Sequence, residues 1–423
     1  MAAPADHPQT AAERLIGRTI AATWLLWLVG ALYIVGPVIG WQLAAFAFIE
    51  LYLGRKSLTA IPAAVWIWIA SMAALLVILW IGHSNFSLGT GQTIKSSIGW
   101  AKGWALIALF PFAGAVLDIR LSVIARAVCR LGMWTLIILP LFLAAPFVGL
   151  PEMLWVSPLR VVGGPGPEYF ATILYTIEPG AGTPRWQFFA PWSPAAGMVA
   201  VIYVFIAAQE KDLSWRLVGI AGFLAIALLS QSRLALVAIA MVAPIAWAAG
   251  RVDRGWLWWL AAGGVLIVGL FGLEIAAFVE QLASDFSSAR ADSSRVRAAL
   301  GRIALERWEN EAYWFGHGIV ENGPHLVEYM AIGSHHSWYG LLFVKGLLGA
   351  LALALPLFLT VARLAWTARA GAVQRTGFAL ALVLVLYSFG ENLEILAYLF
   401  WPALVLIGKA LAASPTDDTS NTQ

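Results

Sequence analysis

Two adjacent histidines, His335 and His336, precede a long apolar run in the stretch SHHSWYGLLFVKGLLG, residues 334–349. An imidazole ordinarily titrates near neutral pH, so it can take the proton of a hydroxyl group or orient that group. Ionisable groups at a membrane segment are costly and commonly mark function. The pair is therefore the first candidate for a catalytic site. The alternative is that both rings only cap the helix that follows.

Arginines form the second candidate group. Arg233 follows SQS directly before an apolar run, and Arg295, Arg297 and Arg302 occur in SSRVRAALGRIALERW, residues 293–308. A guanidinium group keeps its charge and binds phosphate oxygens through two parallel hydrogen bonds. We therefore interpret these four arginines as candidate anion-binding residues. The alternative for each is a solvated, ion-paired helix face.

Two carboxylates, Glu391 and Glu394, occur in the short polar segment GENLE. We interpret them as a second functional acid pair, with an ordinary polar loop as the alternative. A competing interpretation gathers four histidines around zinc: His317, His325, His335 and His336. The sequence has no HExxH motif and no second cysteine beside Cys129, so we predict no metal site.

The composition identifies the medium in which these groups must work. Of the 423 residues, 61% are hydrophobic and 12% are charged. A soluble protein could not bury so much apolar surface, so the sequence predicts an all-α, polytopic membrane protein. The 22 tryptophans agree, because indole rings favour the bilayer interface. The formal net charge of +3, without a basic block, indicates no nucleic-acid partner.

Apolar runs of membrane length predict about twelve transmembrane spans. The first two lie between Arg18 and Arg55, with a turn near Pro37 because proline interrupts a helix. Segment DIRLSVIARAVCRLG, residues 118–132, is predicted to be a cytoplasmic connection. The other spans are predicted at about 60–82, 98–117, 133–150, 191–208, 217–230, 234–249, 256–273, 337–361, 377–389 and 395–411.

The positive-inside rule places the basic clusters and both termini in the cytoplasm. The expected organisation is a cytoplasmic segment 1–18, a transmembrane domain 19–411 and a polar tail 412–423. A large periplasmic loop, 274–334, then lies between spans nine and ten. The SQSR turn, the histidine pair and GENLE fall on the same outer face as this loop. Such a gathering of polar groups is typical of an active site that opens to the periplasm, although outer loops are also polar simply as loops.

The loop contains a predicted amphipathic helix over residues 293–308, with Ser293 or Ser294 as its cap. Arg302 and Glu306 are spaced to form an i,i+4 ion pair. The apolar stripe is formed by Val296, Leu300, Ile303 and Trp308. The glycine motifs GHG, at 316–318, and NGP, at 322–324, then end the helical pattern.

In this order the motifs resemble the O-antigen ligase and Wzy-type polymerase superfamily, over roughly residues 217–365. The superfamily has a Ser-Arg entering a span, an outer-loop arginine before Gly-x-Gly, and His-Asn-x-Tyr-Leu before a span with Gly-Leu-x-Gly. His335 precedes Gly346 by eleven positions, the spacing usual in that superfamily, so the resemblance favours His335 as the essential histidine. His336 then stands where the superfamily usually has asparagine.

The resemblance implies that the arginines bind the diphosphate of a lipid-linked donor and that Glu391 and Glu394 bind the acceptor. It assigns the arginines less uniquely than the histidine. Arg233 matches the Ser-Arg that enters a span. For the loop arginine, Arg297 has the better spacing to Gly316, Arg295 has the better Ser-Arg context, and Arg302 is third.

The resemblance implies a bacterial inner-membrane glycosyltransferase. Such an enzyme moves a glycan from undecaprenyl diphosphate to an acceptor hydroxyl on the periplasmic face, with inversion and without a metal or cofactor. Implied partners are the lipid-linked donor, a glycan or lipid A-core acceptor, the bilayer, a flippase and a chain-length regulator. The lack of a separate protein-acceptor domain favours a polymerase over a ligase. The alternative is a polysaccharide or lipid-linked sugar transporter without catalysis, which predicts inverted repeats and charges near mid-membrane.

Overall fold

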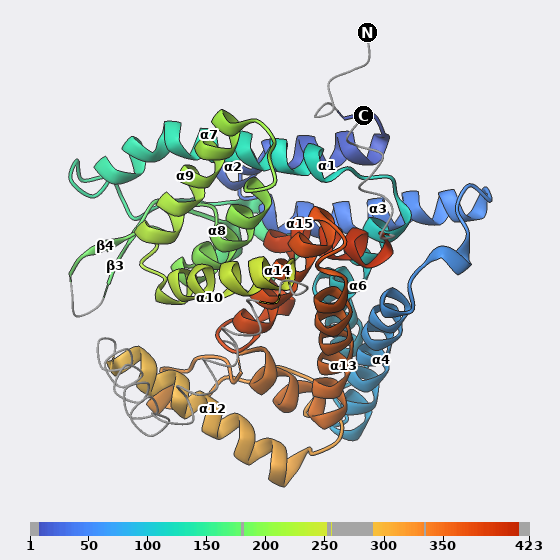
Figure 1. The fold of residues 1–423 in the computed structure, drawn as a ribbon. Coiled ribbons are helices and arrows are strands. Elements are labelled where there is room, and N and C mark those ends of the chain that lie inside the picture. Colours follow the sequence, from blue (N-terminus) through green and yellow to red (C-terminus); the bar gives the residue numbers. More distant parts are fainter. Residues whose placement is uncertain (1–7, 179–181, 252–254, 256–290, 334–335, 414–423) are drawn as a thin grey trace.

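The computed structural model of the protein describes residues 8–178, 182–251, 255, 291–333 and 336–413, and only the backbone of residues 291–294. The described chain is mostly helical, and its strands form two small antiparallel sheets (Figure 1). This confirms the predicted helical class.

Six helical segments are long and apolar enough to cross a membrane, which supports a multi-pass membrane protein. They are α3 (Leu32–Tyr52), α4 (Ala63–Asn85), α5 (Thr90–Lys102) joined to α6 (Trp104–Val116), α7 (Leu121–Ala144), α13 (Ser337–Thr367) and α15 (Leu393–Ala412). The shorter apolar helices are α8 (Ser193–Ala207), α9 (Leu213–Leu229), α10 (Arg233–Ala249) and α14 (Ala372–Ser388). The predicted span at 256–273 lies outside the described residues, so the count of twelve stays a prediction.

The predicted turn near Pro37 is wrong, because α3 runs through this proline. Helices α1 (Ala11–Ala21) and α2 (Thr23–Leu28) come first, and the chain turns at Gly30, whose φ is +65°. A Cβ atom on Gly30 would lie 2.5 Å from the carbonyl oxygen of Phe170. The neighbouring Gly36 instead packs its backbone against Tyr398 of α15. The glycines beside Pro37 therefore allow close helix packing and do not form a turn.

The segment 118–132 is not a simple connection, because α7 begins within it at Leu121. The guanidinium of Arg126 donates to both carboxylate oxygens of Glu210, at 2.8 and 3.0 Å. Arg120, just before the helix, pairs in the same way with the buried Glu13 of α1. These paired charges can remain on or beside a largely buried helix because each guanidinium has a carboxylate partner.

Helix α15 lies at the centre of the bundle, between α3, α6 and α14 (Figure 1). It is buried along most of its length. A Cβ atom on Gly114 of α6 would come within 2.0 Å of the Val405 carbonyl oxygen in α15. Gly408 of α15 approaches the backbone of Pro111 equally closely. Small residues thus bring the two backbones together, as is usual where helices pack in a membrane.

The segment 151–190, between α7 and α8, carries the two sheets. Strand β1 (Met153–Val156) pairs with β2 (Ala171–Ile173), and β3 (Thr176–Ile177) pairs with β4 (Pro184–Arg185). Thr172 donates from its hydroxyl to the carbonyl oxygens of Trp27 and Leu28, at the end of α2. The short 3-10 helices of the chain are η1 (Leu58–Ala60), η2 (Pro158–Val162), η3 (Pro167–Phe170) and η4 (His325–Val327).

The predicted loop helix exists as α12 (Ala291–Glu311), which lies across one end of α13 (Figure 1). Its described buried face contains Val296, Ala299, Leu300 and Ala304. The predicted pair Arg302–Glu306 does not form, and the i,i+4 ion pair of this helix is instead Arg307–Glu311. Arg302 and Glu306 are both exposed, where an ion pair contributes little, whereas Arg307 has two carboxylate partners, Glu311 and Glu321. The side chains of Ser293 and Ser294 lie outside the described residues.

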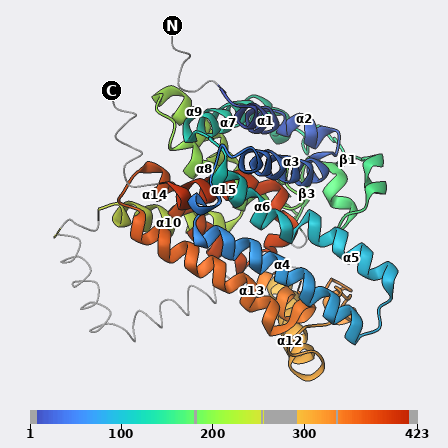
Figure 2. The ribbon, with the colours of Figure 1, turned by 90° about the vertical axis from the view of Figure 1, so that its right-hand side faces the viewer.

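Helix α13 runs beside α4 (Figure 2) and is broken at Gly346, whose φ is +64°. In a continuous helix the amides of Leu347 and Leu348 would bond to the carbonyls of Phe343 and Val344. Here Leu347 donates to the carbonyl of Tyr313, at 2.9 Å, and Leu348 donates to Trp314, at 3.3 Å. The segment after α12 thus accepts the bonds of the two amides.

The same segment also satisfies the carbonyls at the break. The amides of His317 and Gly318 donate to the carbonyls of Phe343 and Val344, each at 2.9 Å. Gly316 has a φ of +65°, and a Cβ atom there would lie 2.3 Å from the Lys345 nitrogen. Gly-x-Gly and the glycine inside the span, two separate sequence motifs, are therefore two sides of one backbone contact. We call it the 313–318/Gly346 interlock.

Replacing Gly346 with alanine should destabilise the protein strongly. A Cβ atom there would meet the backbone of Trp314 at 2.4 Å, and the left-handed conformation costs a non-glycine residue about 1–2 kcal/mol on its own. We expect a clear fall in the midpoint of thermal unfolding in detergent micelles. Gly99→Ala is the matched control, because Gly99 is a helical glycine with nothing within 4 Å of an added Cβ atom. An unchanged midpoint for Gly346→Ala would contradict the interlock.

Candidate functional site at the start of helix α13

A pocket of about 220 Å³ lies between α12, the start of α13 and the corner between α14 and α15. Two residues predicted for the site from the sequence, Arg297 and His336, both line it. The complete lining is Arg297, Ala298, Leu300, Gly301, Gly333, His336, Tyr339, Phe389 and Gly390. The structure therefore brings a guanidinium and an imidazole from separate segments to one cavity.

The apolar face of α12 positions Arg297. Leu300 packs in a small cluster with Val327 and Phe343, which joins α12 to the following loop and to α13. A Cβ atom on Gly301 would lie 2.7 Å from the ring of Tyr339, so only glycine lets the two helices approach this closely. Arg297 stands one turn before Gly301 on the helix and so lies over the same contact.

His336 is the N-cap of α13. Its Nδ1 accepts the amide proton of Tyr339, at 3.3 Å, and its ring stacks on the Tyr339 ring with centroids 4.0 Å apart. Burial lowers the pKa of His336 to about 4, so the ring is neutral at pH 7. In a neutral imidazole whose Nδ1 accepts, Nε2 carries the proton. His336 is therefore arranged to donate a hydrogen bond from Nε2 and not to accept a proton at Nδ1.

Glu391 lies in the corner between α14 and α15, next to Gly390 of the pocket lining. Its side chain is 2% exposed, and Trp192 donates from Nε1 to its Oε2, at 2.9 Å. Ser337 ties this corner to the start of α13, because its hydroxyl donates to the Glu391 carbonyl and accepts the amide of Leu393.

Two arginines from different segments act on the Glu391 carboxylate. Burial raises the pKa of Glu391 to about 7, while the hydrogen bond from Trp192 and the charges of Arg297 and Arg185 oppose that rise. Arg297 thus lines the pocket and also stabilises the ionised carboxylate of Glu391.

The SQSR turn lies beside the same corner. Arg233 is the first residue of α10, and the neighbouring Leu234 lies 3.0 Å from the position of an added Cβ atom on Gly390. Arg185, in β4, donates from Nε to the carbonyl of Ser230 in this turn, at 2.8 Å. Arg185 therefore joins SQSR to the Glu391 corner. Arg185 was not predicted from the sequence, where it is marked only by its place in the Pro/Gly-rich segment EPGAGTPRW.

The other predicted residues are placed differently. Arg295 and Arg302 are exposed on α12 and do not line the pocket. Glu394 points away from Glu391, toward Gly103 between α5 and α6, and interacts electrostatically with the buried Lys345 of α13. His335 lies outside the described residues, so its predicted role is untouched by the geometry.

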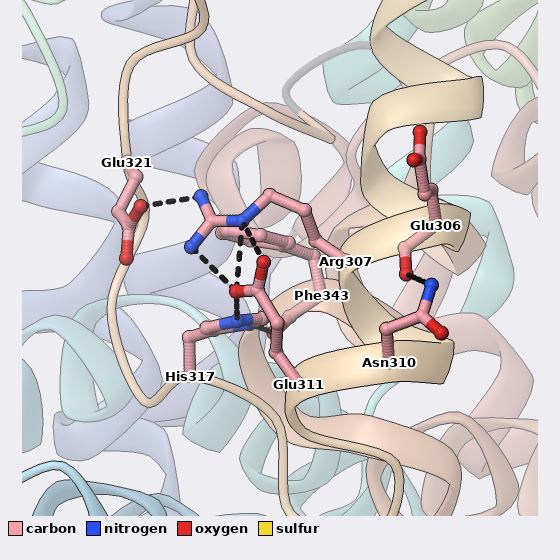
Figure 3. A network of polar contacts seen from close by, with 7 residues as sticks. All are labelled: Glu306, Arg307, Asn310, Glu311, His317, Glu321 and Phe343. Carbon is pink, nitrogen blue, oxygen red and sulfur yellow. Dashed lines mark hydrogen bonds and ion pairs between the residues drawn. The ribbon is translucent and has the colours of Figure 1, made fainter.

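A polar network joins the end of α12 to the loop that follows (Figure 3). Arg307 donates to Glu311 of its own helix and to Glu321 of the loop, at 2.9 and 2.6 Å. His317 contacts Glu311 through Nε2, at 2.8 Å, and the carbonyl of Phe343 through Nδ1, at 3.0 Å. Both ring nitrogens of His317 therefore have a polar partner. Because His317 takes part in both, the network connects α12 to the interlock.

Within the described ranges, no three His, Cys, Asp or Glu side chains gather closely enough to hold a metal ion. His317 and the exposed His325 point to different surroundings. His83 contacts the carbonyl of Gly318 through Nε2, at 2.9 Å, and so belongs to the interlock.

Comparisons with known proteins give no family assignment. No family model matches the sequence, and no curated protein is significantly similar to it.

Replacing His317 with phenylalanine should destabilise the α12–α13 contact. Phenylalanine keeps the ring that stacks on Phe343, with centroids 4.3 Å apart, but loses both polar contacts. The Phe343 carbonyl keeps its bond from the amide of residue 317, so the variant loses the contact with Glu311 and the second contact on that carbonyl. A hydrogen bond contributes about 0.5–1.5 kcal/mol, so we expect a lower unfolding midpoint in detergent. The matched control is His325→Phe at an exposed position, which should leave the midpoint near that of the wild type. Equal midpoints for the two variants would contradict a structural role for His317.

Proposed function

We propose that the protein is a glycosyltransferase of the bacterial inner membrane. It transfers a glycan from undecaprenyl diphosphate to an acceptor hydroxyl on the periplasmic face, without a metal. The observation that carries this proposal is the pocket that contains Arg297 and His336 on elements distant in the sequence. The motif resemblance to O-antigen ligases and Wzy-type polymerases supports it as well, because Arg297 and the histidine pair belong to the motifs that carry the resemblance.

The proposed reaction needs an anion clamp and a base. Arg297 and Arg233 bind the diphosphate and offset the charge that grows as it leaves. The neutral His336 donates from Nε2 to an oxygen of the donor. The acceptor oxygen bonds to the anomeric carbon while the bond from that carbon to the diphosphate oxygen breaks, with inversion. The hydroxyl proton passes to His335, and undecaprenyl diphosphate leaves with the electron pair.

A polymerase is the form that we favour. Its acceptor would be another lipid-linked repeat, whereas a ligase would use a lipid A-core acceptor. The described outer segments are short sheets and one helix, which leave little structure dedicated to a separate acceptor. A flippase that delivers the donor and a chain-length regulator would then be functional partners.

A transporter of polysaccharide or lipid-linked sugar is the second candidate, and one observation favours it. Buried ionisable side chains within membrane helices commonly mark transport pathways. Lys345 of α13 is 4% exposed and interacts electrostatically with Glu394 of α15. A transfer assay separates the two candidates, because only the enzyme joins glycan to acceptor.

The first test compares variants of the two adjacent histidines. Each variant is placed in lipid nanodiscs with an undecaprenyl-diphosphate glycan, and the extension of the glycan chain is measured. His335→Ala should abolish transfer. His336→Asn should keep most of it, because an asparagine oxygen can cap the Tyr339 amide and its amide group can donate in place of Nε2. His336→Ala, which loses both contacts, should be impaired. Full turnover by His335→Ala would overturn the assignment of the base.

The second test uses the arginines. Arg297→Lys keeps the charge but loses the paired donors, so kcat/KM for the donor should fall by about tenfold or more. Arg302→Lys, on the same helix but away from the pocket, should change kcat/KM by less than about twofold, as surface charges contribute little. Equal losses in the two variants would contradict a specific role for Arg297 in binding the donor.

A further inference from the structure

The Glu391 carboxylate is buried beside the pocket, and the proposed reaction gives it no role. A buried carboxylate is costly unless charges and hydrogen bonds compensate for the lost water. Glu391 is 2% exposed, accepts one indole hydrogen bond from Trp192, and is stabilised electrostatically by Arg297 and Arg185. These two cations come from separate segments, α12 and β4, and both interact electrostatically with the one carboxylate.

Arg297 is shared between this carboxylate and the pocket, which Gly390 also lines. A diphosphate in the pocket would bring its own negative charge toward the same guanidinium. Like charges at short range oppose each other's binding, so the carboxylate and the diphosphate compete for Arg297.

We propose that Glu391 is the resident counter-ion of the site, which neutralises the arginines when the pocket is empty and takes up a proton when the diphosphate of a lipid-linked donor binds. This inference rests on the proposed function, because it assumes a diphosphate ligand. It makes Glu391 a positioning residue for the arginines and departs from the acceptor-binding role expected from the sequence.

The sign of the pH effect follows from linkage. In the empty site Glu391 titrates near pH 7, because burial raises its pKa to about 7. A bound diphosphate repels the ionised form and raises that pKa further, so binding takes up a proton and is tighter at low pH. If the bound state is fully protonated, the dissociation constant should rise by about tenfold from pH 6 to pH 8.

The other described groups that interact with Glu391 do not produce this profile. Arg297 of α12 and Arg185 of β4 stay charged, and Trp192 does not titrate. Tyr387 of α14 and Tyr169 of η3 also interact electrostatically with Glu391, but phenols remain neutral below pH 8. His336, in contact with Phe389, has a pKa that burial lowers to about 4, so it is neutral from pH 6 to pH 8.

The test measures binding of undecaprenyl diphosphate that carries a single sugar to the full-length protein in nanodiscs, at pH 6, 7 and 8. The two phosphates of this probe are esterified, so its own charge is constant over the range. The wild type should show the tenfold weakening. Glu391→Gln keeps an oxygen that can accept the Trp192 proton and removes the charge, so its affinity should be independent of pH and near the wild-type value at pH 6.

Glu309→Gln is the control, because Glu309 is an exposed carboxylate on α12, the helix that carries Arg297. It should keep the wild-type pH profile. A wild-type profile in Glu391→Gln would overturn the inference, and so would pH-independent binding that is much weaker than that of the wild type, which would indicate only a structural role. Binding is measured without turnover, so a protein that binds the probe but transfers no glycan would contradict the proposed enzyme and leave this inference standing.

Discussion

The geometry of the site depends on one backbone exchange, the 313–318/Gly346 interlock. A peptide group without a partner costs several kcal/mol away from water, so a break in a membrane helix persists only where other protein groups replace the lost bonds. The amides and carbonyls of the segment after α12 do this for α13. The exchange fixes the end of α12 to the middle of α13, and Gly301 against Tyr339 fixes their other contact. Arg297 and His336 are therefore held across one pocket by two contacts that only glycine permits.

The distribution of charge follows from the same apolar surroundings. Carboxylates in the described chain are paired where they are buried, as Glu13 is with Arg120 and Glu210 is with Arg126. The Glu391 corner differs, because two arginines act on one carboxylate. Each guanidinium offsets part of the cost of burying this carboxylate.

The sequence predicts much of this arrangement because the signals are local. Apolar length located most of the helices, and the 3.6-residue period located α12 together with its buried face. Pro37 misled the prediction because a proline alone does not report whether its neighbouring glycines turn the chain or admit a second helix. Arg185 was missed because its role arises only when β4 packs on the SQSR turn. Glu391 and Glu394 looked equivalent in one short motif, but the start of α15 turns them toward different neighbours.

The capping bond of His336 bears on how two adjacent histidines divide their work. A helix beginning at Ser337 needs an acceptor for the Tyr339 amide, and either an imidazole nitrogen or an asparagine oxygen supplies one. This explains physically why histidine can stand where the resembling proteins usually have asparagine. A ring held in this way would lose its cap if Nδ1 took a proton, whereas a general base must change its hydrogen bonding during the reaction. Position 336 is therefore suited to orient a group and to donate a hydrogen bond to it, and is poorly suited to accept a proton.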